Sequence, residues 1–436
     1  MTVLLNFAAL AAMVHGGSQG VLTMEEAVQL ATKNAFNIRR QISEIEKNRQ
    51  KVKENEGGLG PRVTISGTYT RFEEEKSTQI APGQSIVTQP IDTKQATASL
   101  QFPIDISGNI GRIVRASKAN LVASEFTLDA VRNDVKLAVR RAYISILRAD
   151  EQIEVAKQAI AEAEERLKNV RAEEQQGTKA KIDVIRIEAQ LAQAQSDLIT
   201  AQNQEALAKQ NLNNVIGRPI ETAFETEKIA NLPAAPTADP DSVDKVAQGT
   251  RPEVKALGKT REALAFVTRA TERGLNPTLT VGINHQRNID AQGFTAQEQV
   301  TTGTVNINWP IFDSGITRAQ VKQARQDEEQ AKIQMQQVQL GVSLEVRQAI
   351  TNMVNAAARL AVAQRQLTAA EENYRISKVR QAAGEGITLE VTDALNQLTQ
   401  ARTGLVSARY DYWTAYSELQ RAVGTDNLQQ LLGGNN

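Results

Sequence analysis

The chain has 436 residues, and its 50 acidic and 50 basic side chains balance, so no overall field favours nucleic acid as a partner. Cysteine is absent, which excludes disulfides, thiol nucleophiles, cysteine metal sites and a cysteine-linked lipid anchor. The two histidines, His15 and His285, stand far apart in the sequence, so we expect no metal site, no cofactor and no Ser-His-Asp chemistry. The composition therefore argues against an enzyme.

Residues 1–20 resemble a secretory signal peptide. The apolar run 3–14 is too short to span a bilayer, and small residues follow it. No lysine or arginine precedes the run, so a disordered or weakly helical leader is the alternative. No later segment approaches ~20 uninterrupted apolar residues, so a chain that enters a membrane must do so without a helix.

The next segment, 21–60, is predicted to be an N-terminal helix. Thr23 can cap it, and two glutamates in its first turn would complement the helix dipole. The helix should end near Gly57, shortly before Pro61.

Two further segments, 61–104 and 276–311, are each predicted to form a pair of strands. Apolar residues such as Val63 and Ile65 alternate there with threonine, serine, asparagine and glutamine, which gives one apolar and one polar face. A polar stretch around Pro82 separates the first two strands as an exposed loop. A soluble sheet would show the same alternation, but a second face this polar is typical of a water-filled barrel in lipid. Three aromatic residues near the predicted strand ends are candidates for an aromatic girdle: Tyr69, Phe102 and Trp309.

The second half of the chain repeats the first. Residues 102–217 align with 309–424 at a constant offset of 207 and without a gap, which indicates one supersecondary unit built twice. Equivalent residues mark the strand-to-helix junctions and the turns between helices: Pro103 and Pro310, Gly108 and Gly315, Gly177 and Gly384. After each junction, apolar residues recur at alternating spacings of three and four, the seam of a coiled coil. The first of these helices has about 64 residues before a helix breaker, a length of ~95 Å.

These patterns define the expected domain organisation. It consists of a first repeat at 61–217 with a long helical hairpin at 110–217, an irregular proline-rich connector at 218–250, a second repeat at 251–424 with a helix at 252–273 and a helical hairpin at 315–424, and a C-terminal tail at 425–436.

Four strands per chain cannot close a barrel, and an open edge in lipid leaves backbone groups unpaired at a cost of several kcal/mol each. Two, three or four chains would supply 8, 12 or 16 strands, and three is the smallest number that leaves an open pore. The predicted architecture is therefore a mixed α/β membrane protein that associates as a trimer.

Short motifs follow one another in a fixed order along the chain: LTMEEAVQLATKN at 22–34, FPIDISG at 102–108, RPEV at 251–254, WPIFDSG at 309–315 and ARYDYWTAYSELQRAVG at 408–424. In this order the chain resembles the TolC-type outer-membrane efflux proteins, or outer membrane factors. The resemblance implies a homotrimer with a 12-strand β-barrel in outer-membrane lipid, continued by a long 12-helix barrel across the periplasm. It also implies the function, a passive exit channel of a tripartite efflux pump or type I secretion system. The implied partners are a periplasmic adaptor (membrane fusion) protein and an inner-membrane transporter.

The resemblance places a candidate periplasmic gate in the turn of the second hairpin, GEGITLEVTDAL at 384–395. Glu390 and Asp393 match the paired acids with which the family lines its entrance, and the spacing i, i+3 puts both on one helix face. In a trimer they would form a ring of six carboxylates that attracts cations. Two acids at the start of a helix also complement its dipole, which is the structural alternative.

The two hairpin turns differ in charge. In the first, Asp183 has Lys179 and Lys181 nearby, so its charge is partly cancelled, whereas Glu390 and Asp393 are expected to be unopposed.

The family often has a tyrosine and an arginine near the second turn. This chain has Gln381 and Gly386 at those positions, so we expect its gate to be held more loosely or closed by different contacts.

The main alternative is a soluble periplasmic coiled-coil adaptor or scaffold protein. An adaptor should carry one helical hairpin within β-rich flanking domains, and a scaffold would leave the predicted strands unexplained. Two hairpins, each preceded by strands with a polar second face, favour the channel.

Overall fold

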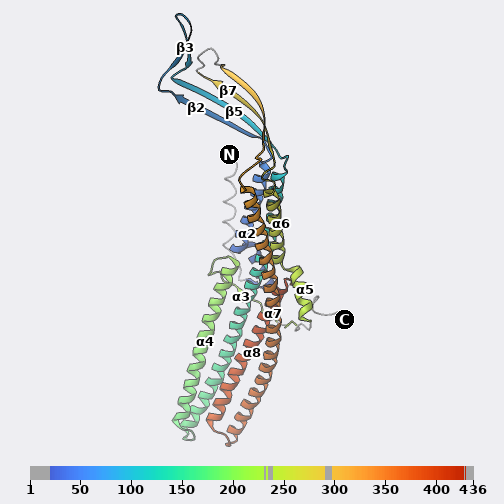
Figure 1. Cartoon of the computed structure of the whole chain (residues 1–436). Helices are drawn as coiled ribbons and strands as arrows, with labels where there is room; N and C mark the ends of the chain where they lie inside the picture. The colour runs from blue at the N-terminus through green and yellow to red at the C-terminus, as the bar shows by residue number, and fades with distance from the viewer. Residues whose placement is uncertain (1–19, 230–231, 234–238, 290–296, 427, 429–436) are drawn as a thin grey trace. The chain divides into compact units, whose positions relative to one another are not determined.

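The computed structural model describes residues 20–229, 232–233, 239–289, 297–426 and 428, and Figure 1 labels its helices and strands. The predicted signal peptide lies outside the described residues, apart from its last position. The chain divides into two compact units. The hairpin unit comprises Met1–Ile42, Thr127–Val254 and Val338–Asn436, and the sheet unit comprises Ser43–Phe126 and Lys255–Gln337.

The sheet unit is built on four antiparallel strands in the order β2-β5-β7-β8. They are β2 (Arg62–Arg71), β5 (Asp92–Ile104), β7 (Thr278–Asn288) and β8 (Gln299–Asn308). The register places Val63 of β2, Leu100 of β5 and Ile283 of β7 in one row across the sheet. β2 and β8 are the edge strands, and each pairs on one side only within the described part of the chain.

The two faces of this sheet differ in polarity. One face is apolar, and its large side chains are 38–80% exposed: Val63, Ile65, Leu100, Phe102, Ile283, Val305 and Ile307. The opposite face carries uncharged polar residues, as in the row Thr64, Ser99, Asn284 and Thr302. An apolar face of this extent is unfavourable in water, so it requires an apolar surrounding.

A small second sheet corrects one expectation from the sequence. The polar stretch expected to be a loop instead forms a hairpin of β3 (Lys76–Ala81) and β4 (Gln84–Gln89). Pro82 and Gly83 lie in its turn, and Gly83 has a φ of 83°, as the third position of a type II turn requires. β-Branched residues on both sides of this turn favour strands over a loop.

The first strand-to-helix junction holds a capping acid that sequence reasoning missed. Asp105 accepts hydrogen bonds from the backbone N–H groups of Gly111 at 2.8 Å and Ile110 at 3.2 Å. These amides belong to the first turn of α3 (Asn109–Gln175), whose N–H groups have no partner within the helix. Gly108, the predicted junction glycine, has a φ of 67° and lies between the acid and the helix.

At the second junction an aspartate also caps the helix, but it stands one residue later in the repeated motif. Asp313 accepts hydrogen bonds from the N–H groups of Thr317 at 2.7 Å and Gly315 at 3.0 Å, at the start of α7 (Ile316–Ala382). The hydrogen bonds from Thr317 lower the pKa of Asp313. The predicted prolines differ in position, because Pro103 lies within β5 whereas Pro310 follows β8.

Helices of the sheet unit approach one another through small side chains. Ala116 and Ala119 of α3 pack against Ala263 of α6 (Pro252–Thr271), with Phe266 beside them.

In the hairpin unit, the N-terminal segment forms two helices where the sequence predicts one. They are α1 (Met24–Asn34) and α2 (Phe36–Gly57), and Ala35 between them has a ψ of 131°. The break faces Gly217, whose backbone is so close that a Cβ there would lie 2.7 Å from the Asn34 carbonyl oxygen. Close tertiary contact therefore accompanies the break, which no glycine or proline marks in the sequence. Thr23 caps α1 in a capping box with Glu26.

The connector at 218–250 is also more regular than expected. Its β6 (Glu225–Thr226) pairs in parallel with β1 (Val21–Leu22), and its C-terminal part forms α5 (Pro240–Thr250). Asp239 caps α5, and Pro240 occupies the first helical position, where a missing N–H costs nothing. The buried Tyr143 hydroxyl holds the strand pair to α3: it lies 2.8 Å from the carbonyl oxygen of Leu22 and 2.9 Å from that of Glu227.

Two long helical hairpins make up most of the hairpin unit, and their turns lie at the same end of it in Figure 1. α3 returns as α4 (Lys181–Ile216), and α7 returns as α8 (Thr388–Val423). Near the turns, Leu167 and Ile187 pack together in the first hairpin, as Leu367 and Leu398 do in the second. No helix within the described residues combines the length and the hydrophobicity that a membrane span requires.

Candidate functional site

The turn of the first hairpin is closed by backbone and hydroxyl hydrogen bonds. Gly177 adopts a φ of 75°, and the N–H and hydroxyl of Thr178 donate to the Glu173 carbonyl at 3.0 and 2.9 Å. Asp183 follows in the first turn of α4, and its carboxylate lies 3.8 Å from the guanidinium of Arg186. An arginine of its own helix therefore opposes Asp183, in addition to the lysines noted in the sequence.

The turn of the second hairpin is tighter. Gly384 has a φ of 79°, and the N–H groups of Glu385 and Gly386 both donate to the carbonyl of Arg380, at 2.9 and 3.1 Å. A Cβ on Gly386 would lie 3.0 Å from the backbone nitrogen of Gln381. This turn has little room for the larger residue that the family often carries at position 386.

The structure corrects the expectation that both acids of the second turn are unopposed. The Nη1 of Arg380 lies 3.6 Å from the Oε2 of Glu390, and both side chains are about half exposed. Asp393 is exposed, and no ion pair of it is found within the described part of the chain. The two candidate gate acids are therefore electrostatically unequal, with Asp393 the less compensated one.

A buried arginine ties the first hairpin to the start of α8. Arg166 of α3 is 8% exposed, and its Nη2 donates to the Thr392 hydroxyl at 3.1 Å and to the Thr388 carbonyl at 3.5 Å. Burial lowers the pKa of Arg166 from its ordinary value, because the charged guanidinium loses water. Its Nη1 has no hydrogen-bond partner among the described residues. Arg166 thus positions the helical turn that carries Glu390.

A series of ion pairs connects α3 to α8 over a longer distance. Four of the α3 residues share one helix face at multiples of seven, and the pairs are Asp134 with Arg421, Arg141 with Glu418, Arg148 with Asp411 and Glu162 with Arg402. Along α3 the series runs acid, base, base, acid, and α8 carries the opposite charge at each step, so these pairs favour one register between the two hairpins.

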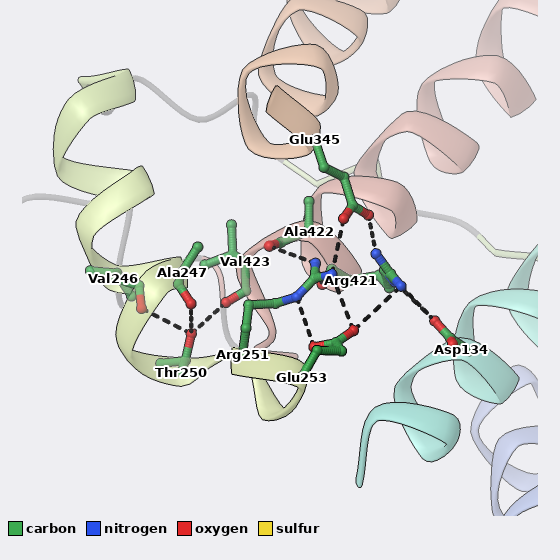
Figure 2. Close-up of polar contacts among 10 residues, drawn as sticks. All are labelled: Asp134, Val246, Ala247, Thr250, Arg251, Glu253, Glu345, Arg421, Ala422 and Val423. Atoms are coloured by element: carbon green, nitrogen blue, oxygen red, sulfur yellow. Dashed lines mark hydrogen bonds and ion pairs between the residues drawn. The ribbon is translucent and has the colours of Figure 1, made fainter. Parts of the chain in front are cut away.

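At the other end of α8, the RPEV motif binds the helix terminus (Figure 2). Arg251 is 3% exposed, and its Nη1 donates to the carbonyl oxygens of Arg421 and Ala422, both at 3.0 Å. The same guanidinium pairs with Glu253 at 3.1 Å and with Glu345 at 2.9 Å. A cation at this position complements the negative end of the helix dipole.

Figure 2 also shows how this cluster continues to a third helix. Arg421 of α8 pairs with Asp134 of α3 at 2.8 Å and with Glu345 of α7. The Thr250 hydroxyl donates to the carbonyl oxygen of Val423 at 2.7 Å. In the sequence RPEV is only a motif of the family, and neither the burial of Arg251 nor its partners can be read from it.

The girdle candidates are all exposed, at 58% for Tyr69, 44% for Phe102 and 61% for Trp309. Phe102, near the end of β5, and Trp309, directly after β8, belong to the junction end of the sheet. Tyr69 lies at the opposite end, where it pairs with Lys94.

A groove of about 920 Å³ lies between α3, α4 and α8 and is lined mainly by glutamine, threonine and alanine. Gln190 and Asn396 form a hydrogen bond of 2.9 Å between two of its walls. No group of three or more His, Asp or Glu side chains is arranged to hold a metal ion among the described residues.

Comparison with known proteins identifies the family. The sequence profile of the outer membrane efflux proteins matches residues 27–218 and 245–425, which include both repeats. The chain belongs to the outer membrane efflux protein family. As a member it is an outer-membrane channel protein of efflux or secretion, with its helical part in the periplasm.

Relatives of the same family are similar over most of their length. The chain is 22% identical to the alkaline protease secretion protein AprF of Pseudomonas aeruginosa, over 92% of this chain and 84% of the relative. It is 24% identical to the cobalt-zinc-cadmium resistance protein CzcC of Cupriavidus metallidurans, over 93% and 90%. These matches span both repeats and give no support to the adaptor or scaffold alternative.

Solved outer-membrane channels share the fold. The outer-membrane channel OprN superposes with a TM-score of 0.78 at 19% identity, covering 92% of this chain and 89% of that one. The CmeC channel of Campylobacter jejuni gives 0.78 at 18% identity, covering 92% and 85%.

Proposed function

We propose that three copies of this chain form the passive exit channel of a tripartite efflux pump or type I secretion system. The four-stranded sheet carries this proposal. Its exposed apolar face suits lipid, its uncharged polar face suits a water-filled lumen, and its two edge strands need partners. Pairing β2 of one chain with β8 of the next closes a barrel of 12 strands when three chains take part.

The hairpin unit supports the same association. α3 and α8 are joined to each other by ion pairs, whereas α4 and α7 keep large apolar side chains exposed. These exposed side chains include Ile182, Ile185, Ile199 and Leu207 on α4 and Leu340, Leu344, Val354 and Val362 on α7. Packing α4 of one copy against α7 of the next would bury both sets within a ring of 12 helices.

The acids of the hairpin turns are proposed to form the periplasmic gate. Glu390 and Asp393 of three chains would face one pore, with Asp183 of the first turn nearby, and the ring would favour cations. The Arg380 partner of Glu390 makes Asp393 the main source of this preference.

The proposed partners are a periplasmic adaptor at the helical end and an inner-membrane transporter that supplies the energy. The named relatives serve cargo as different as a protease and metal ions. An uncharged polar lumen suits both, so we propose that the transporter selects the cargo.

Native mass spectrometry of the detergent-extracted protein tests the assembly. The expected species is a complex of three chains that survives mild detergent and dissociates on heating. A protein that stays monomeric across several mild detergents would refute the trimer.

Planar-bilayer recordings test the gate. Glu390→Ala with Asp393→Ala should lower the ratio of cation to anion permeability, whereas Asp129→Ala, which removes an exposed acid of α3, should leave it unchanged. An unchanged ratio in the double variant would count against the acid ring.

A further inference from the structure

The ionisable residues of the four-stranded sheet are concentrated on one face. Apart from tyrosine, five lie on the apolar face at the end away from the junctions: Arg71, Asp92, Lys94, His285 and Arg287. At the same level the opposite face carries uncharged residues such as Thr68, Gln95 and Asn288. Within these four described strands, the opposite face has a single charged residue, Arg62, at the junction end.

This distribution is the reverse of what solubility would favour. If these charges served only to keep the strand ends in water, they would occur on both faces, and mainly on the polar face. Instead they lie on the apolar face, directly beyond the rows of apolar side chains. Leu100 pairs with Ile283, His285 is two residues further along β7, and Arg287 two further again. At about 3.4 Å per residue, Arg287 lies roughly 14 Å beyond Ile283 along the strand.

The single acid of the group is already engaged by neighbours on the sheet. Asp92 accepts a hydrogen bond from the Tyr69 hydroxyl at 2.7 Å and lies 3.9 Å from Arg71. Arg287 lies 3.6 Å from Glu298, but both side chains are more than half exposed, and such pairs are weak and exchange readily with other anions. Among the strand residues described on this part of the face, basic side chains therefore outnumber acidic ones.

We propose that Lys94, Arg287 and His285 form a binding site for the phosphate groups of anionic lipid headgroups, at the rim of the apolar face. The inference rests on the proposed function in one respect, that the apolar face is the one in contact with lipid. Lys94 and Arg287 are diagonal neighbours on adjacent strands, a Cα spacing of about 7–8 Å that one phosphate can bridge. Their aliphatic stems lie along apolar surface while the charged ends reach the headgroups.

Competition between two lipids tests the site. The detergent-purified protein is equilibrated with equimolar phosphatidic acid and phosphatidylcholine, and the lipids retained are counted by native mass spectrometry. A basic residue near an anionic lipid surface contributes about fivefold in binding, so Lys94→Gln with Arg287→Gln should reduce the preference for phosphatidic acid by up to about thirtyfold. Arg62→Gln, which removes a charge from the opposite face of the same sheet, should leave the preference unchanged.

Equal retention of both lipids by the wild type, no change in the double variant, or an equal loss in Arg62→Gln would each overturn the inference. Displacement of phosphatidic acid by inorganic phosphate alone would also overturn it, because the site would then bind a free anion rather than a lipid surface. Insertion into phosphatidylcholine vesicles separates the two proposals. A protein that inserts but shows no lipid preference refutes only this site, whereas one that does not insert refutes the membrane-facing sheet itself.

Discussion

Arg380 and Glu390 face each other across the turn of the second helical hairpin, with the Nη1 of Arg380 3.6 Å from the Oε2 of Glu390. One of the two acids proposed for the gate therefore has a cation beside it in the same chain. The turn that brings them together depends on Gly386, whose N–H donates to the Arg380 carbonyl at 3.1 Å.

Removing this cation should increase the selectivity of the channel for cations. An exposed ion pair contributes up to ~1 kcal/mol, so Arg380→Ala should raise the permeability ratio by no more than about fivefold. For the same reason Asp393→Asn should lower the ratio more than Glu390→Gln does. Arg375→Ala removes a somewhat more exposed arginine from the same helix and serves as the control in bilayer recordings. Equal effects of Arg380→Ala and Arg375→Ala would contradict a specific role for the pair.

The contact between Arg166 and Thr392 should stabilise the start of α8. Thr392→Val keeps the shape of the side chain but leaves the buried guanidinium without its 3.1 Å acceptor, at an expected cost of about 1–3 kcal/mol. Thr403→Val is the matched control, because the exposed Thr403 hydroxyl only donates to a carbonyl of its own helix. Urea unfolding followed by circular dichroism measures both. A control as destabilising as Thr392→Val would rule out a special contribution from Arg166.

The guanidinium of Arg251 makes several hydrogen bonds at once, and we expect that the amine of a lysine cannot replace it. Arg251→Lys keeps the charge but cannot bind two carbonyls and two carboxylates at once, so we expect a loss of about 1–3 kcal/mol in unfolding free energy. Arg347→Lys, at an exposed pair with Asp241, should cost less than ~1 kcal/mol. Similar unfolding midpoints for the two variants would show that the cluster in Figure 2 adds little.

The equivalent glycines Gly217 and Gly424 offer a comparison within one chain. Both end a helix in the left-handed conformation, with φ of 80° and 76°, so alanine at either site should cost about 1–2 kcal/mol. Only Gly217 has a backbone oxygen, that of Asn34, 2.7 Å from the added Cβ; at Gly424 the nearest atoms are 3.4 Å away. Gly217→Ala should therefore be the more destabilising by a further ~1–3 kcal/mol in thermal unfolding. The reverse order would show that α1 moves aside freely.

Ionisation of Tyr143 should lower the stability of the folded protein at alkaline pH. Burial raises the pKa of Tyr143 to about 12, so the folded state favours the neutral phenol. This contribution, at most about 2–3 kcal/mol, is complete below pH 10 and is lost as the pH rises through 12. Tyr143→Phe lacks it, and also lacks the hydrogen bonds to Leu22 and Glu227.

The measurement is the difference in unfolding free energy between wild type and Tyr143→Phe across this pH range. The wild type should be the more stable at pH 8, and its advantage should shrink toward pH 12. A difference that does not change with pH would mean that the phenol titrates equally in the folded and unfolded states.

The sequence predicts the regular parts of this fold because their causes are local. A heptad seam without glycine or proline leads to α3, and a period of two with threonine on one face leads to β2. Asp239 before Pro240 is a readable helix start that the sequence analysis did not use, and it marks the beginning of α5.

The remaining features depend on contacts between distant parts of the chain. Nothing near Ala35 signals a helix break, which becomes intelligible only when Gly217 is seen against Asn34. Likewise Arg166 meets Thr392 from 226 residues away, and no spacing rule connects them. The ion pair of Glu390 could not be predicted because its partner, Arg380, lies before the turn. Only the path of the turn places the two side chains next to each other.

The capping acids Asp105 and Asp313 occupy positions that differ by one residue in the duplicated motif, since Asp105 aligns with Phe312. The later position comes with a left-handed Ser314, at a φ of 55°, which has no counterpart in the first copy. In the proposed trimer, six equivalent halves around the pore would permit sixfold symmetry, and these unequal junctions would limit it to threefold. The two halves are therefore not interchangeable, because the acid that caps the long helix stands at a different position of the motif in each.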